Sequence, residues 1–86
     1  MEIIKTKDFN KAFEKLPKEI QELYAEQEKR FEKDWREQRL HIKKVRSLKF
    51  ALSFRITRRY RVFFYFQNTD KAIFFDVDHR KDAYKL

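Results

Sequence analysis

The first 35 residues carry two apolar stripes with the spacing of α-helices, preceded by a short strand over Glu2–Lys7. Asp8 is well suited to cap the first helix. Pro17 suits the first turn of the second helix, which we expect to run to Asp34 or Trp35. These segments predict a strand followed by a helical hairpin. The stripe of the first helix contains Phe9, Ala12, Phe13 and Leu16; the second contains Ile20, Leu23, Tyr24, Phe31 and Trp35, with Gln27 as a polar interruption.

After Trp35 the pattern changes to the alternation of β-strands. His41–Lys44 is expected to form a short edge strand, whose lysines discourage aggregation. Leu52–Ile56 alternates apolar and polar residues, Tyr60–Phe66 is apolar on both faces like a central strand, and Ala72–Asp78 is the last strand. The predicted order is β-α-α-β-β-β. This is an α+β fold with an N-terminal strand and helical hairpin packed on an antiparallel sheet.

The turns must form without glycine, because the sequence contains none. We expect any turn that needs a positive φ to use Asn or Asp, or to avoid that geometry. Asn68–Asp70 supplies such residues between the last two strands.

The strand pattern also predicts which residues lie opposite one another. A loop of Thr57–Arg59 pairs Ile56 with Tyr60, and this register places Arg55 directly opposite Arg61 on the face away from the helices. Like charges in that arrangement destabilise a strand pair, and a phosphate bound between the two guanidiniums would relieve the repulsion. Alternatively, each arginine pairs with a carboxylate and a second layer covers this face.

Aromatic residues continue the same face and favour a nucleic-acid partner. Phe63 and Tyr65 follow Arg61 in alternation, and arginines beside aromatic rings suit stacked, unpaired bases. On the last strand, pairing Phe66 with Ile73 sets Arg61 opposite Asp78. In that register Ile73, Phe75 and Val77 face the core, and Ala72, Phe74 and Asp76 face away.

Charge is concentrated in one part of this chain. The 86 residues carry a formal net charge of +8, and the stretch from Trp35 to Val62 holds ten basic residues and one acidic residue. A field focused in this way attracts polyanions, of which nucleic acid is the usual one, although a solvated basic surface without a partner is also possible. An anionic membrane is less favoured, because the basic stretch is mostly β-structure rather than an amphipathic helix.

Composition excludes several classes of function. Absence of cysteine removes disulfide and thiol chemistry, and two histidines do not make a zinc site without carboxylates. No apolar run approaches ~18 residues and no signal peptide opens the chain. We therefore expect one cytoplasmic domain over residues 1–86, with no metal, no cofactor and no membrane partner.

The C-terminal segment adds candidate chemistry. His79, Arg80 and Tyr84 directly follow the last strand, so their side chains are expected near the edge of the basic face. Arginine can stabilise a pentavalent phosphate, and histidine or tyrosine can transfer protons. A metal-free ribonuclease, in which the RNA 2′-OH attacks the adjacent phosphate, fits these groups; a structural tail with Tyr84 as a lid is the alternative.

The order of these motifs resembles the RelE/ParE superfamily of bacterial toxins. The resemblance rests on Lys44–Arg46, Ser53–Ile56, Tyr60–Val62 and His79–Tyr84, and covers nearly the whole chain. It implies a fold akin to microbial ribonucleases and a toxin neutralised by a cognate antitoxin protein. In the RelE branch it implies an mRNA endonuclease acting in the ribosomal A site. The alternatives are a non-catalytic ParE-type inhibitor of DNA gyrase, or an inactive relative that binds only RNA or antitoxin.

The resemblance also implies roles for individual residues. Arg61 and Arg80 correspond to the arginines that stabilise the transition-state phosphate, Tyr84 to the C-terminal tyrosine that stacks on a base, and His79 to an acid or base. Arg55 takes the place of a basic residue on the preceding strand. Ser53 stands where some active members carry a second basic residue, and Asp78 where a glycine is often found. RNA and ribosome contacts are expected from Lys43, Lys44, Arg46, Lys49, Arg58, Arg59, Phe63 and Tyr65.

Overall fold

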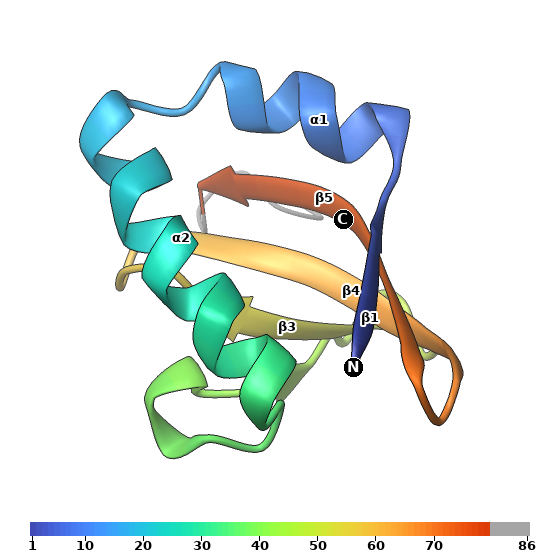
Figure 1. The fold of residues 1–86 in the computed structure, drawn as a ribbon. Helices are drawn as coiled ribbons and strands as arrows, with labels where there is room; N and C mark the ends of the chain where they lie inside the picture. The colour runs from blue at the N-terminus through green and yellow to red at the C-terminus, as the bar shows by residue number, and fades with distance from the viewer. Residues whose placement is uncertain (80–86) are drawn as a thin grey trace.

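A five-stranded mixed sheet, covered on one face by two helices, organises residues 1–79, the part of the chain that the computed structural model describes (Figure 1). The elements are β1 (Glu2–Lys5), α1 (Lys7–Glu14), α2 (Lys18–Lys33), the 3-10 turn η1 (Gln38–Leu40), β2 (Lys43–Lys44), β3 (Leu52–Arg55), β4 (Tyr60–Asn68) and β5 (Lys71–His79). The strand order is β1-β5-β4-β3-β2, with β1 parallel to β5 and the other neighbours antiparallel. The predicted α+β class is confirmed, as is the order β-α-α-β-β-β, to which the two-residue edge strand β2 is added.

The first helix is capped by Thr6, whereas the sequence predicts Asp8 as the cap. The Thr6 hydroxyl accepts a hydrogen bond from the backbone N–H of Phe9 at 3.1 Å. Asp8 lies instead in the first turn of α1, where a carboxylate interacts favourably with the helix dipole. The helix therefore begins earlier than predicted, and β1 is shorter than Glu2–Lys7.

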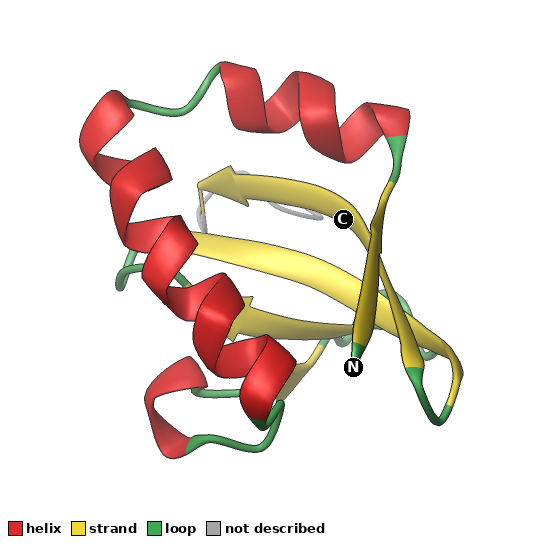
Figure 2. Ribbon diagram, in the orientation of Figure 1, coloured by secondary structure: helices red, strands yellow, loops and turns green. Residues whose placement is uncertain are grey.

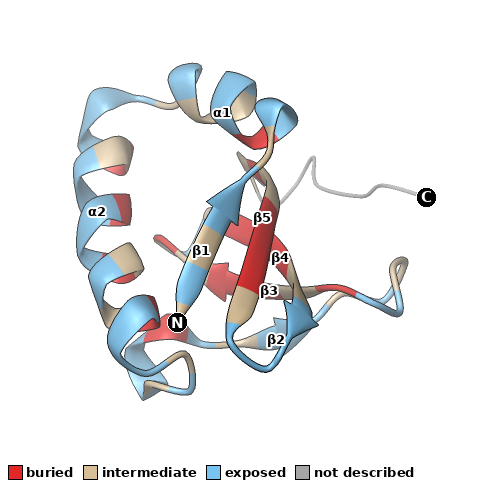
Figure 3. Ribbon diagram, turned by 45° about the vertical axis from the view of Figure 1, so that its right-hand side comes forward, coloured by how far each residue is buried: buried red, intermediate tan, exposed pale blue. Residues whose placement is uncertain are grey.

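The core lies between the helices and the sheet, and aromatic rings fill it. Phe31 of α2 contacts Phe54, Phe64 and Phe74 with ring centroids 4.9–5.4 Å apart. These rings and Phe9 of α1 are almost completely buried. Figure 2 shows the two helices on the same side of the sheet, and Figure 3 shows that their buried positions are turned inward.

The stripe of α2 differs from the prediction at two positions. Leu23 is 42% exposed, whereas Gln27 is buried. The Gln27 amide donates to the backbone carbonyls of Arg39 and Arg55 at 2.9 and 2.6 Å, and its oxygen accepts from Arg30 at 2.7 Å. Gln27 therefore joins α2 to η1 and to the end of β3.

The β3–β4 hairpin matches the predicted register, but the β4–β5 pairing does not match throughout. Arg55 pairs with Arg61, and Arg61 pairs with Asp78, as expected. A register shift between Phe63 and Phe64 then pairs Phe66 with Ala72, one residue from the predicted partner. Val77 faces the helices as predicted, but so do Ala72 and Phe74 instead of Ile73 and Phe75, because the β-bulge reverses their faces. Ile73 is buried on the other face, where it pairs with Tyr65.

The segment before β3 also differs from the expectation. Only Lys43–Lys44 forms the edge strand, because His41 ends η1 in the left-handed conformation with φ of 48°. Histidine is one of the non-glycine residues that tolerate this region. Within residues 1–79 the positive-φ position is therefore taken by histidine, not by Asn or Asp as predicted.

Candidate nucleic-acid interface

The sheet face opposite the helices carries the candidate RNA-binding side chains. Neighbouring side chains along a strand point to opposite faces, so the burial of Phe54 and Val62 against the helices turns Arg55 and Arg61 away from them. We call this side of the sheet the open face. The open face carries two adjacent cross-strand rows of side chains. The first row contains Lys43, Ser53, Phe63 and Asp76, and the second contains Arg55, Arg61 and Asp78.

Arg61 is held in place by groups of neighbouring segments. Its side chain is 5% exposed, although its charge is retained at any ordinary pH. The Nε atom donates to the Ser53 hydroxyl at 2.9 Å, and Nη2 donates to the carbonyls of His41 and Ser53 at 2.6 and 3.3 Å. The Ser53 hydroxyl is thus a hydrogen-bond acceptor for the central arginine.

Arg55 lies beside Arg61 and is less completely satisfied. The two residues are directly paired across β3 and β4, so two guanidinium groups share the open face. Within residues 1–79, the Arg55 Nε is the buried side-chain nitrogen or oxygen atom that lacks a hydrogen-bond partner. A buried donor without an acceptor is costly, and an anion between the two arginines would supply one.

Acidic residues bound the same face on β5. Asp78 pairs with Arg61 in register, and its carboxylate accepts the backbone N–H of His79 at 2.7 Å. Asp76 pairs with Phe63 and accepts the backbone N–H of Val77 at 2.8 Å. These carboxylates lower the positive potential on the β5 side, so the strongest anion attraction falls toward β3.

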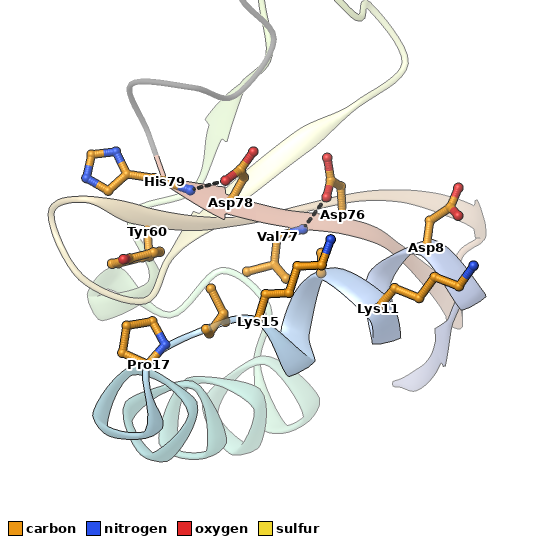
Figure 4. A pocket seen from close by; sticks show the side chains of 11 residues that line it. Asp8, Lys11, Lys15, Pro17, Tyr60, Asp76, Val77, Asp78 and His79 are labelled. Atoms are coloured by element: carbon orange, nitrogen blue, oxygen red, sulfur yellow. Dashed lines mark hydrogen bonds between the residues drawn. The ribbon is translucent and has the colours of Figure 1, made fainter.

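His79 ends β5 and pairs with Tyr60, and their rings meet edge to face at 5.2 Å. Because paired side chains share a face, this register puts His79 out of phase with Arg61. Both rings line a cavity of about 500 Å³ at the end of the sheet, together with Lys11 of α1, Lys15 at the C-cap of that helix and residues of β5 (Figure 4). The described structure therefore does not bring His79 together with the two arginines.

The cations predicted to contact RNA are all exposed, and they lie at both ends of the open face. Lys43 and Lys44 form β2, and only Lys43 shares the row of Ser53, because Lys44 pairs with Leu52. Arg58 and Arg59 lie in the β3–β4 turn, beside the arginine pair. Arg46 and Lys49 lie in the connection between β2 and β3.

The aromatic residues of the open face differ in part from those predicted. Phe63 is buried, with 4% exposure, whereas Tyr65 is half-buried. Tyr65 packs with Phe50 and Phe75, two residues that the sequence reasoning missed. Phe75 was missed because the bulge in β5 reverses the face on which alternation places it. Phe50 was missed because it precedes β3, and the sequence signal available for it was its position beside Lys49.

The C-terminal candidates Arg80 and Tyr84 lie outside the described residues. Across residues 1–79, no group of three potential metal ligands comes together. In the same range, neither helix is long and apolar enough to cross a membrane.

Comparison with solved structures places this architecture among the RelE and YoeB/ParE toxin folds. A chain of the RelB–RelE antitoxin–toxin complex from Methanococcus jannaschii superposes with a TM-score of 0.75 at 24% identity, over 94% of both chains. The archaeal RelE–RelB complex from Pyrococcus horikoshii OT3 gives 0.72 at 21% identity, over 95% of this chain and 97% of that one. The YoeB/ParE toxin from Agrobacterium tumefaciens gives 0.76 at 10% identity, over 93% and 99%. No family model and no curated protein matches the sequence.

Proposed function

We propose that the protein is the toxin of a type II toxin–antitoxin system, a metal-free endoribonuclease that cleaves mRNA in the ribosomal A site. The observation that carries the proposal is the Arg55–Arg61 pair on the open face, with a buried donor on Arg55 that lacks a partner. The shared fold with RelE-type toxins supports it, as do the exposed cations at both ends of that face.

In the proposed reaction the RNA 2′-OH attacks the adjacent phosphorus and the 5′-oxygen of the next nucleotide leaves. The attacking oxygen loses a proton to a base, and the leaving oxygen gains one from an acid. Arg55 and Arg61 stabilise the extra negative charge on the phosphate oxygens as the bond to phosphorus forms. Because Arg61 is already oriented by Ser53 and His41, little rearrangement is needed when the charge develops.

The C-terminal segment completes the proposed site. Arg80 is assigned to the same phosphate and Tyr84 to stacking on a base. His79 is assigned to proton transfer, for which its ring must leave Tyr60 and turn toward the arginine pair. Lys43, Lys44, Arg46, Lys49, Arg58 and Arg59 are assigned to phosphates of the mRNA and of ribosomal RNA. The proposed setting is the cytoplasm, with a cognate antitoxin protein as the neutralising partner.

The test is induced expression in cells, followed by primer extension on an abundant translated message. We expect growth arrest and cuts within codons that disappear when translation is blocked. Arg55→Gln should reduce the cuts by about 100-fold or more, because one charged donor to the transition state is lost. Arg36→Gln, at an exposed arginine beside Trp35, should leave them unchanged.

Other outcomes separate the alternatives. Growth arrest without cuts would reject the nuclease and favour inhibition of gyrase. Neither arrest nor cuts, from a folded protein that still binds its antitoxin, would indicate an inactive relative. Arg55→Gln as active as the wild type would remove the arginine pair from the mechanism.

A further inference from the structure

Three aromatic rings form a cluster on the open face, away from the arginine pair. The ring centroids of Phe50 and Tyr65 lie 5.7 Å apart, those of Phe50 and Phe75 6.0 Å, and those of Tyr65 and Phe75 5.7 Å. The three rings come from the β2–β3 loop, β4 and β5 respectively. We call Phe50, Tyr65 and Phe75 the aromatic cluster.

Phe50 is the member of the cluster that solvent reaches. It is 61% exposed, against 42% for Leu23 and 37% for Ile4, the other large exposed apolar residues of the described chain. Isolated exposed apolar residues are common, but Phe50 packs against the rings of Tyr65 and Phe75. Tyr65 is itself only half-buried. The cluster therefore offers an aromatic surface and not a single exposed side chain.

The loop that carries Phe50 is well ordered by its own hydrogen bonds. Backbone N–H groups of Val45, Leu48 and Ala51 donate to the carbonyls of Ala51, Val45 and Leu48, at 3.0–3.2 Å. Ala51 is buried, which fixes the loop to the sheet. Phe50 is thus presented in a defined position, at little entropic cost on binding.

Cations flank Phe50 within its own loop, which has no acidic residue, and Asp76 lies next to Phe75 on β5. Arg46 and Lys49 are exposed in the loop, and Lys43 extends the row from β2. Exposed rings among cations are what a single-stranded nucleic acid requires, because bases stack on the rings while phosphates contact the charges. This charge complementarity favours an unpaired nucleic acid over a protein segment.

We propose that the aromatic cluster is a stacking platform for unpaired bases of the RNA, with Arg46 and Lys49 on the flanking phosphates. The choice of RNA rests on the proposed function, but the platform does not require cleavage. Tyr65 and Arg61 are four residues apart on β4, which is about 13 Å. One RNA strand crosses that distance, so the platform holds nucleotides beside the one that reacts.

The experiment measures binding of the purified protein to a fluorescent oligouridine that carries 2′-O-methyl groups and cannot be cleaved. An abasic oligomer of equal length is measured in parallel. Phe50→Ala should weaken binding to the base-bearing oligomer by about 5- to 100-fold and change binding to the abasic one little. Phe50→Trp should restore the affinity, and Leu23→Ala, an exposed apolar residue on α2, should leave both affinities unchanged.

Equal weakening of both oligomers by Phe50→Ala, or no weakening of either, overturns the platform. Loss of antitoxin binding by Phe50→Ala without an effect on the oligomers also overturns it, and makes the cluster a protein-docking surface. If base-dependent binding is seen but expression yields no cuts in mRNA, the platform stands and the proposed nuclease fails. If cuts occur but the wild type prefers the abasic oligomer or binds neither, the platform alone fails.

Discussion

At the scale of single residues, the geometry of the candidate site depends on a buried arginine. Arg61 cannot lose its charge, so its burial requires acceptors around the guanidinium. The described structure supplies the Ser53 hydroxyl and two backbone carbonyls, one of them from His41 in its left-handed conformation. Ser53 and His41 are therefore positioning residues for Arg61.

Ser53→Ala removes the acceptor of the Arg61 Nε and should lower the free energy of unfolding by about 1–3 kcal/mol. We expect RNA cleavage to fall with unchanged RNA affinity, because an arginine that is free to turn still attracts phosphate. Urea unfolding and cleavage assays measure the two effects. Ser53→Thr, which keeps the hydroxyl, should recover the activity. The matched control is Ser47→Ala in the preceding loop. Equal losses of stability and activity in the two alanine variants would contradict the role assigned to Ser53.

Tyr24 of α2 gives the fold a dependence on alkaline pH. Burial raises the pKa of Tyr24 far above its ordinary value of 10.0, and its hydrogen bond to Glu28 adds to the effect. Lys5 of β1 forms an ion pair with the same carboxylate at 2.7 Å and lies over the Tyr24 ring. The hydroxyl thus takes part in a contact between β1 and α2.

Stability should fall as the pH rises above about 10. Below that pH, Tyr24 is protonated in both the folded and the unfolded chain; above it, only the unfolded chain loses the proton, so unfolding is favoured. The Tyr24→Phe variant has no such proton, so its free energy of unfolding should fall less between pH 10 and 12. Urea unfolding at each pH measures this difference. Parallel curves for the two proteins would show that Tyr24 does not contribute.

At the scale of elements, Gln27 fixes the position of α2 relative to η1 and β3. A buried glutamine in an apolar stripe is tolerated because its amide satisfies carbonyls at the ends of two other segments. One of these carbonyls belongs to Arg55, so the contact also supports the backbone of the candidate site.

Gln27→Ala should reduce the free energy of unfolding by about 1–3 kcal/mol, since two buried carbonyls lose their donor. Thermal or urea unfolding measures the loss. Gln38→Ala, at an exposed position of η1, should have little effect. A Gln27 variant as stable as the Gln38 variant would mean that water replaces the amide.

The bulge in β5 accounts for the main failure of the sequence prediction. Alternation assigned Phe75 to the core and Phe74 to the open face, which is the reverse of the structure. A bulge leaves almost no signal in a run such as Ile73–Phe75, where every residue is apolar and both assignments look acceptable.

Two adjacent phenylalanines test this assignment directly. Phe74→Ala should cost about 3–5 kcal/mol of stability, because the ring is completely buried among core aromatics. Phe75→Ala should cost clearly less, because its ring is half-buried on the open face. Equal costs, or the reverse order, in urea unfolding would contradict the bulged register.

At the scale of the whole molecule, the layers of the fold separate charge. The chain up to Asp34, which forms β1 and the two helices, holds nearly equal numbers of acidic and basic residues. The excess positive charge belongs to β2, β3, the start of β4 and their loops. Nucleic acid is therefore expected to approach the sheet and not the helical layer.

The salt dependence of RNA binding should report which cations take part. Each phosphate contact contributes about 0.7 to the slope of log affinity against log salt concentration for a single strand. The double variant Arg46→Ala, Lys49→Ala should reduce the slope by roughly 1.4. The double variant Lys11→Ala, Lys15→Ala, in α1 and at its C-cap, should leave the slope unchanged. Equal effects of the two double variants would indicate non-specific attraction.

Most of the fold and part of the candidate site could be predicted from the sequence. Alternation and loop length were sufficient to place Arg55 opposite Arg61, because the hairpin register follows from the positions of Phe54 and Val62. The support of Arg61 by the His41 carbonyl was not predictable, since it depends on a left-handed residue in an irregular segment. Phe50 was missed for a similar reason, because it precedes the strand and belongs to a loop without periodicity.

The parallel pairing of β1 with β5 has a consequence for synthesis. Thr6, which follows β1, donates from its hydroxyl to the carbonyl of Phe75, 69 positions later in the chain. At about 5–20 residues per second, a ribosome needs roughly 3–14 s to make that interval. During this time β1 has no partner strand, and β4, once it is made, lacks a partner on the edge that β5 will occupy. The nascent chain therefore passes through a stage in which the sheet, and with it the open face, is incomplete.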